Sequence, residues 1–119
     1  MAFYQLRIVV AEKKFDEFID SLLSLSSGIR KEQGCLDFSL YRDLEKNDVY
    51  RVIGEWKTRQ AMEKHFNQKL FSVLIGAAKV LSEDFQMNVG EILEKGSHQL
   101  AKEKITVDPN KGKTVEKKA

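Results

Sequence analysis

The spacing of apolar residues along positions 1–95 alternates between the two-residue repeat of a β-strand and the longer repeat of an α-helix. Residues 3–10 are rich in aromatic and β-branched side chains and predict a strand. In the segment that follows, apolar residues recur at intervals of three and four, at Phe15, Phe18, Ile19, Leu22, Leu25 and Ile29. This stripe predicts a helix that covers a sheet.

Glycines mark the next two changes of structure. The pair Gln33-Gly34 predicts the end of the helix, because glycine readily takes the left-handed conformation found at many helix ends. Two alternating runs, 35–42 and 49–57, then flank the polar segment DLEKND and predict an antiparallel hairpin. Gly54 interrupts the second run, which indicates a bulge or a close approach to the backbone.

Two short helices and a last strand complete the pattern. Thr58 is a candidate N-cap for a helix through RQAMEKHFNQ, and a break near Asn67 separates it from a second helical stripe. That stripe consists of Leu70, Phe71, Leu74, Ala77, Ala78 and Leu81. Residues 85–93 alternate again and predict a fourth strand. The order predicts an α+β fold, a ferredoxin-like βαββαβ sandwich with a four-stranded antiparallel sheet.

The two helices of such a fold lie on one face of the sheet and leave the other face uncovered. Leu36, Phe38 and Leu40 alternate with other residues, as do Val49 and Ile53, in a way that predicts apolar side chains on both faces. An uncovered apolar face requires a partner, so we expect a homodimer in which two sheets pack face to face.

The composition limits the functions to be considered. A chain of 119 residues predicts one domain, and its 20 basic and 18 acidic residues are too balanced and dispersed for a nucleic-acid partner. The sequence shows neither a secretory signal pattern nor an apolar run long enough to span a membrane. One cysteine and two histidines exclude an internal disulfide and a Cys/His metal site, and we expect a cytoplasmic protein.

Residues 96–119 differ from the predicted domain at 1–95. They are polar and rich in lysine, which predicts a flexible tail. Residues 105–107 could instead form a short strand, and the tail would then pack across the domain or across a partner subunit.

Three stretches together resemble the antibiotic biosynthesis monooxygenase family: GCLDFSLYRD, VYRVIGEWKTRQAMEKHF and FQMNVGEIL. The resemblance covers about residues 2–95, and its most specific parts are Gly34-Cys35-Leu36, Glu55-Trp56 and His65. It implies a dimeric α/β barrel and a relationship to cofactor-free quinol and anthrone monooxygenases. Several relatives carry a second histidine at the position of Leu70, and haem-degrading members place their iron-binding histidine at the position of Ile75. Because isoleucine cannot bind iron, haem degradation is disfavoured.

The resemblance implies that His65 is the catalytic base of a reaction without cofactor or metal. Histidine suits this role because its ordinary pKa of about 6.5 lets it accept a proton near neutral pH. The ligand would be a small aromatic or hydrophobic molecule, such as a quinol-like or polycyclic aromatic substrate. We expect its pocket to be lined by Trp56, Met62, Phe66, Asn67, Phe71 and Leu74.

Each of these assignments has a structural alternative. A lone helical histidine is often a hydrogen-bonded core residue, a tryptophan at a strand end is often buried, and Asn67 also suits a helix cap. Two other functions stay open at this point: a non-catalytic dimeric module that binds a small hydrophobic ligand, and an isomerase of a small oxygenated metabolite. The isomerase would require more polar groups in the pocket than the sequence identifies.

Overall fold

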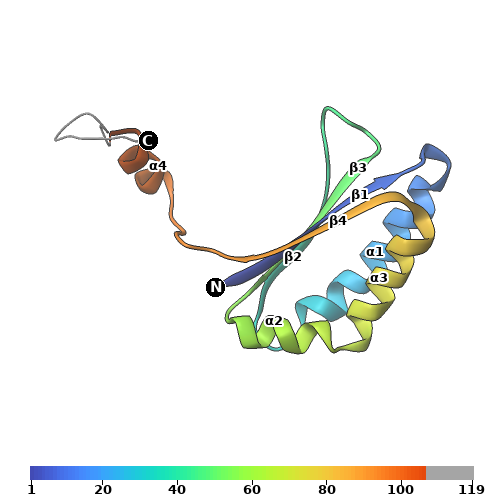
Figure 1. The fold of residues 1–119 in the computed structure, drawn as a ribbon, viewed down its shortest axis with the longest axis horizontal. Helices are drawn as coiled ribbons and strands as arrows, with labels where there is room; N and C mark the ends of the chain where they lie inside the picture. Colours follow the sequence, from blue (N-terminus) through green and yellow to red (C-terminus); the bar gives the residue numbers. More distant parts are fainter. Residues whose placement is uncertain (107–119) are drawn as a thin grey trace.

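The computed structural model describes residues 1–106, which contain a four-stranded antiparallel sheet with the strand order β2-β3-β1-β4 (Figure 1). The strands are β1 (Ala2–Val10), β2 (Cys35–Arg42), β3 (Val49–Trp56) and β4 (Ser82–Glu91). The central strand β1 pairs with β3 on one side and with β4 on the other. The predicted α+β fold with ferredoxin-like order is therefore confirmed.

Helices cover only one face of this sheet (Figure 1). They are α1 (Phe15–Arg30), α2 (Arg59–Phe66) and α3 (Lys69–Leu81), and a short 3-10 helix (Glu12–Lys14) precedes α1. The apolar stripe predicted for α1 faces the core, with four of its members buried: Phe18, Leu22, Leu25 and Ile29. The predicted break at Asn67 is confirmed, because this residue lies between the end of α2 and the start of α3.

The core lies between the sheet and these helices. Along β1 every second residue is buried, namely Ala2, Tyr4, Leu6, Ile8 and Val10. Opposite them on β3 lie Tyr50, Val52 and Trp56, which are also buried. Burying one large apolar side chain contributes about 1.5–3 kcal/mol, so this face accounts for much of the stability of the fold.

The two glycines singled out in the sequence both have structural roles. Gly34 has a φ of +84°, as predicted, although α1 already ends at Arg30 and Gly34 closes the turn that follows. A Cβ atom at Gly34 would lie 2.5 Å from the Ala61 Cβ. At Gly54 a Cβ would lie 2.9 Å from Cε2 of Tyr4, so the expected close approach is confirmed. The register shifts of the sheet lie elsewhere, on β2 between Cys35 and Asp37 and on β1 between Val9 and Val10, where it pairs with β4.

The start of the last strand and the segment after residue 95 differ from the prediction. β4 begins directly after α3 at Ser82, because its polar first residues pair with the end of β1 at Val9 and Val10. The short strand predicted at 105–107 is wrong for Ile105 and Thr106, which belong to helix α4 (His98–Thr106). This helix starts just after Ser97, whose carbonyl accepts hydrogen bonds from the N–H groups of Leu100 and Ala101. The rest of the predicted tail, 107–119, lies outside the described residues.

The face of the sheet opposite the helices carries a mixed set of side chains. Residues paired across antiparallel strands point to the same face, so the register identifies the set on the two central strands. It comprises Phe3, Gln5, Arg7, Val9, Val49, Arg51, Ile53 and Glu55. Val49 and Ile53 thus lie on this face as expected, but polar and charged residues separate the apolar ones.

The chain leaves β4 as an extended arm that carries α4 away from the rest of the domain (Figure 1). This arm turns toward the side of the sheet opposite α1 and α3. Lys95 pairs with Glu55 at 3.3 Å, and Lys104 pairs with Glu94. Leu93 and Ile105 are 93% and 82% exposed, so the arm presents apolar side chains to its surroundings.

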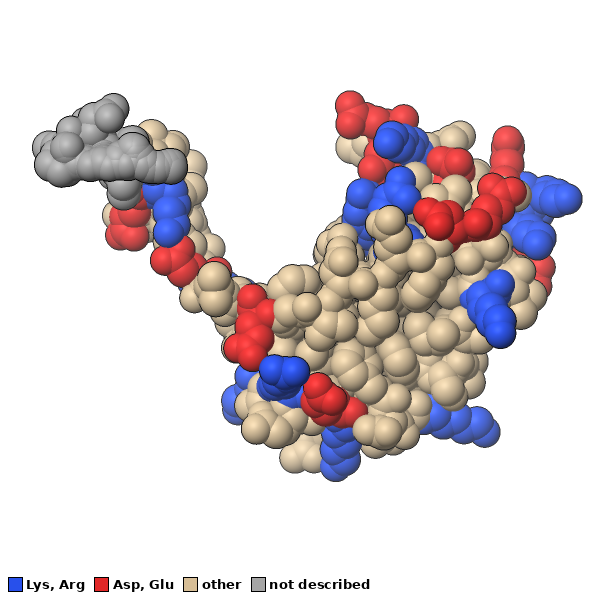
Figure 2. Space-filling view, viewed as in Figure 1, with Lys and Arg blue, Asp and Glu red and all other residues tan. Residues whose placement is uncertain are grey.

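Charges of both signs are mixed over the face shown in Figure 2, where Lys and Arg do not gather into one patch. Such a surface lacks the basic stripe typical of nucleic-acid binding. Within residues 1–106, no helix has the length and apolar character needed to cross a membrane.

Candidate active site around His65

Helix α2 places His65 against the sheet. The Thr58 Oγ1 accepts a hydrogen bond from the Ala61 N–H at 3.1 Å, which fixes the start of the helix as predicted. Met62 and His65 are one helical turn apart and are the two buried residues of α2. His65 therefore points into the domain rather than into solvent.

Glu32 reaches the same point from the turn after α1. Its backbone N–H donates to the Ile29 carbonyl at 3.0 Å, and its carbonyl accepts from the Cys35 N–H at 3.1 Å. The left-handed Gly34 brings this turn against α2, where only a residue without a side chain fits beside Ala61. The turn thereby fixes the Glu32 carboxylate beside the His65 ring.

Tyr4 approaches His65 from the third side. It lies near the start of β1 on the helix face, and the adjacent Gly54 of β3 leaves room for its ring. The aromatic ring of Tyr4 stacks with the imidazole at a centroid distance of 5.5 Å and an interplanar angle of 17°.

Two hydrogen bonds hold the imidazole. His65 Nδ1 lies 2.6 Å from Oε1 of Glu32, and His65 Nε2 lies 2.8 Å from the Tyr4 hydroxyl. The side chain of His65 is 0% exposed, whereas that of Glu32 is 16% exposed. The three residues form a hydrogen-bonded chain from the interior to the surface, although they come from separate parts of the sequence.

The protonation states follow from burial. Burial lowers the pKa of His65, and the hydrogen bond and charge of Glu32 oppose this shift without reversing it. Burial also raises the pKa of Tyr4, and negative charge at Cys35 and Glu32 raises it further. Tyr4 therefore keeps its proton and donates it to Nε2, while the neutral ring donates its Nδ1 proton to the Glu32 carboxylate.

Aromatic rings enclose the imidazole on its remaining sides. Trp56 stacks on it at 4.4 Å between centroids, and Phe71 meets it nearly edge-on at 5.2 Å. Phe66 lies 5.9 Å away by the same measure. The structure thus brings three of the predicted pocket residues around His65, in direct ring contact with it.

The other predicted pocket residues lie elsewhere. Met62 and Leu74 are buried in the core. Asn67 is exposed at the end of α2, where its side-chain nitrogen donates to the Glu63 carbonyl at 3.0 Å. Leu70, at the position of a second histidine in several relatives, packs against α1 beside Gly28.

A cavity of about 230 Å³ reaches His65. Six residues line it, and all except Ala61 have polar or charged side chains: Glu32, Gln33, Ala61, Lys64, His65 and Gln68. A larger hollow of about 560 Å³ adjoins it and shares Gln33, Ala61 and Lys64 with it. The open space beside His65 is therefore bordered by Glu32 and amide side chains, and the aromatic residues lie behind the ring.

Sequence reasoning did not identify Glu32 or Tyr4. Gly54 gave a partial signal for Tyr4, because a glycine within a strand indicates that another group approaches closely. Glu32 lies in a turn, 33 positions before His65, and no local pattern relates the two residues.

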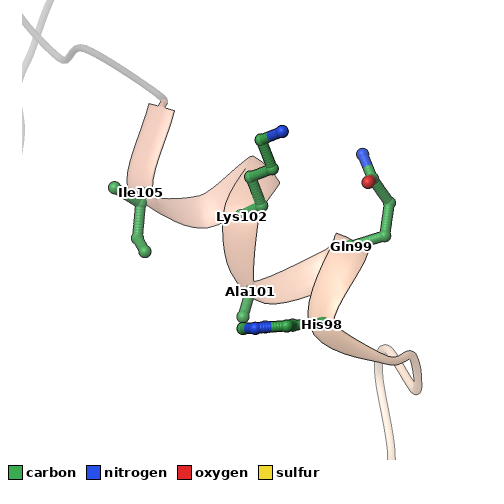
Figure 3. A pocket seen from close by; sticks show the side chains of 5 residues that line it. All are labelled: His98, Gln99, Ala101, Lys102 and Ile105. Atoms are coloured by element: carbon green, nitrogen blue, oxygen red, sulfur yellow. The ribbon is translucent and has the colours of Figure 1, made fainter.

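A separate hollow of about 430 Å³ lies along α4 (Figure 3). The described residues that line it are His98, Gln99, Ala101, Lys102 and Ile105. Their side chains fan out from a single helix and do not converge on one point (Figure 3). This hollow lacks the buried, convergent polar groups found around His65.

Comparison with known proteins agrees with this fold. The model of the family described as antibiotic biosynthesis monooxygenase matches residues 1–75, which is more than half of the chain. The chain therefore belongs to this family.

Crystal structures of several other proteins share the fold. A protein from Deinococcus radiodurans is 20% identical, with a TM-score of 0.75 over 82% of this chain and 97% of that one. A conserved protein from Methanosarcina mazei is 23% identical, with a TM-score of 0.69 over 75% and 90% of the two chains.

A third similar structure is a variant of SnoaB, a cofactor-independent oxygenase from Streptomyces nogalater. It is 18% identical, with a TM-score of 0.69 over 79% of this chain and 94% of that one. The comparison with curated proteins found no match.

Proposed function

We propose that this protein is a cofactor-independent monooxygenase of a small quinol, with the Glu32–His65 pair as its proton acceptor. The observation that carries the proposal is the 2.6 Å hydrogen bond between a buried imidazole and a partly exposed carboxylate at the edge of a cavity. Membership of the family and the fold shared with a cofactor-independent oxygenase support the same reaction class.

The reaction requires a proton acceptor more than any other catalytic group. Loss of a hydroxyl proton gives an electron-rich quinol anion, which can pass electrons to O₂. One oxygen atom enters the ring and the other leaves as water. The four electrons that O₂ accepts come from the quinol, which becomes a hydroxyquinone. In this scheme the protein accepts the proton and holds the anion, and Lys64 supplies a positive charge at the cavity wall.

The size of the cavity favours a compact substrate. Sites for drug-sized ligands usually measure about 300–1,000 Å³, and the cavity at His65 is about 230 Å³. A quinol of one or two rings fits this space better than a polycyclic aromatic molecule. The adjoining hollow beside Lys57 could accept substituents of the ring.

Oxygen consumption by the purified protein tests the proposal. A panel of reduced benzoquinols and naphthoquinols, corrected for autoxidation, would be compared between the natural protein and His65→Gln. We expect protein-dependent uptake that falls about a hundredfold in the variant, the scale of a lost acid–base contribution. His98→Gln on α4 is the matched control and should retain full uptake. Equal turnover by His65→Gln and the natural protein would contradict the proposal.

A second candidate function is the isomerisation of a small oxygenated metabolite. Three polar side chains at the cavity favour it, because Glu32, Gln33 and Gln68 could bind several oxygen atoms at once. An isomerase would move a proton between carbon atoms without consuming O₂. Deuterium incorporation from D₂O into a substrate with no oxygen uptake would identify this reaction.

We also propose that the functional unit is a homodimer. Two features support it: the sheet face opposite the helices is uncovered, and the arm carries α4 toward that side (Figure 1). A second copy seated on this face would cover Phe3 and Ile53 and would lie within reach of the arm. The His65 site lies on the helix face of each sheet and would stay open in such a dimer.

A further inference from the structure

We propose that Glu32 is the residue that contacts the substrate and accepts its proton, and that His65 and Tyr4 are positioning residues behind it. This inference rests on the proposed function above and assigns roles within the same site. Its substrate class is a small proton donor with a hydroxyl group, such as a quinol or an enol.

Accessibility separates the two candidate bases. The His65 side chain is 0% exposed, and stacked rings lie against it. The Glu32 side chain is 16% exposed and borders the cavity. A molecule that enters the cavity can therefore touch the carboxylate without any rearrangement of the protein.

Hydrogen bonding also favours Glu32 over His65 as the base. Both ring nitrogens of His65 are occupied, one by Glu32 and the other by Tyr4. Glu32 uses one carboxylate oxygen, Oε1, for this bond, and Oε2 has no hydrogen-bond partner within residues 1–106. Oε2 is thus available for a substrate hydroxyl, while a direct role for His65 would require one of its two bonds to break.

Tyr4 determines which nitrogen of His65 carries the proton. Its hydroxyl is buried and keeps its proton, so it donates to Nε2 and leaves Nδ1 as the protonated nitrogen. The Nδ1–H then donates to Oε1 and holds the carboxylate in one orientation. In the proton transfer the substrate O–H bond breaks, a new O–H bond forms at Oε2, and the bonding electron pair stays on the substrate oxygen.

The variant Glu32→Gln removes the basic carboxylate but keeps a side chain of the same size in the same position. The glutamine oxygen can still accept the Nδ1 proton and has nearly the same shape, but it cannot take a proton from a substrate. His65→Gln leaves the carboxylate in place and removes only its support. If Glu32 is the base, Glu32→Gln should lower kcat/KM at least tenfold more than His65→Gln does.

A catalytic role for His65 predicts the opposite ranking of the two variants. If His65 is the base, Glu32→Gln retains the hydrogen bond to Nδ1 and should lose less activity than His65→Gln. That ranking would overturn the inference while leaving the proposed oxygenase function intact. Glu32→Asp should recover part of the activity lost in Glu32→Gln. Glu63→Gln, which removes an exposed carboxylate of α2, is the matched control and should match the natural protein.

A second measurement does not depend on turnover. Hydroquinone titrated under argon should shift the carboxyl ¹³C resonance of Glu32, and Glu32→Gln should weaken its binding at least tenfold. The ¹⁵N spectrum of His65 should show a protonated Nδ1 in both the free and the bound protein, and Tyr4→Phe should alter it. Binding that leaves Glu32 unshifted, or that moves the His65 proton to Nε2, would overturn the inference. Binding as expected without oxygen uptake would instead show that only the proposed oxygenase function is wrong.

Discussion

Two buried tyrosines on neighbouring strands differ in the hydrogen bonding of their hydroxyl groups. The Tyr4 hydroxyl is bonded to His65, whereas the Tyr50 hydroxyl is buried without a hydrogen-bond partner in the described part of the chain. Replacement of each by phenylalanine removes one oxygen atom and leaves the ring in the core. The consequences should differ because only one of these changes leaves another buried polar atom without a partner.

We expect Tyr4→Phe to lower the free energy of unfolding by about 1–3 kcal/mol, because Nε2 of His65 then lacks its donor. Tyr50→Phe should leave the free energy of unfolding unchanged or raise it by up to about 1 kcal/mol. Urea unfolding followed by the fluorescence of Trp56, the single tryptophan, measures both variants. An equal loss in the two variants would mean that the Tyr4–His65 bond contributes nothing specific.

At the same scale, the sequence identified His65 and the rings that surround it, and missed Glu32. Helical spacing and the strand-end position of Trp56 are local properties, so they can be recognised within a few residues of sequence. The Glu32–His65 bond depends on how a turn packs against a distant helix. Local spacing also does not show on which side of His65 the aromatic rings pack. For this reason the rings were expected to line the cavity, whereas they lie behind the imidazole.

At the scale of elements, the turn between α1 and β2 determines much of the geometry of the site. Gly34 has a left-handed backbone, and a methyl group on it would overlap with Ala61 of α2. This turn positions Glu32, so a change at Gly34 acts on the fold and on the site together. Gly76 is the natural comparison, because it lies in α3, where an added Cβ would meet no described atom within 4 Å apart from the backbone of its own helix and its chain neighbours.

We expect Gly34→Ala to destabilise the fold by more than about 1–2 kcal/mol, the cost of the left-handed backbone alone, because the overlap with Ala61 adds to it. Gly76→Ala should stabilise it by about 0.5–1 kcal/mol, since alanine favours a helix interior. Thermal unfolding of both variants measures the difference. A neutral Gly34→Ala would show that the turn can move away from α2 at little cost.

The elements themselves were largely predictable because burial of one face imposes a regular spacing on each of them. β1 illustrates this, with every second residue buried from Ala2 to Val10. The start of β4 was less predictable, because it is an edge strand whose side chains are mostly exposed. Without burial, selection for apolar residues at every second position is weak, and polar residues such as Ser82 can belong to a strand.

At the scale of the whole molecule, the arm and α4 were not foreseen. α4 has few apolar residues, so its sequence resembles a solvated segment. The structure places it on the side of the sheet that the other helices leave uncovered (Figure 1). The domain boundary that we propose near Lys95 separates a domain with its own core from an arm that would pack against a second copy of the chain.

The proposed dimer can be tested through Ile53, which lies on the uncovered face between Gln5 and Ser39 of the adjacent strands. We expect the natural protein to sediment with twice the chain mass of 13.7 kDa, and Ile53→Asp to sediment as a monomer, since burying a charge without a partner of opposite sign at the interface is costly. Leu44→Asp, at a fully exposed position of the hairpin turn, is the control and should remain dimeric.

Circular dichroism would establish that Ile53→Asp is still folded, and Tyr41→Asp repeats the test at a position on the same face that is already 50% exposed. If both variants stay dimeric while folded, the copies associate through another surface. If the natural protein is a monomer, the uncovered face and the arm must bind a different partner. Either result would leave the His65 site unchanged, because Glu32, Tyr4 and His65 all belong to one chain and lie on the opposite side of the sheet.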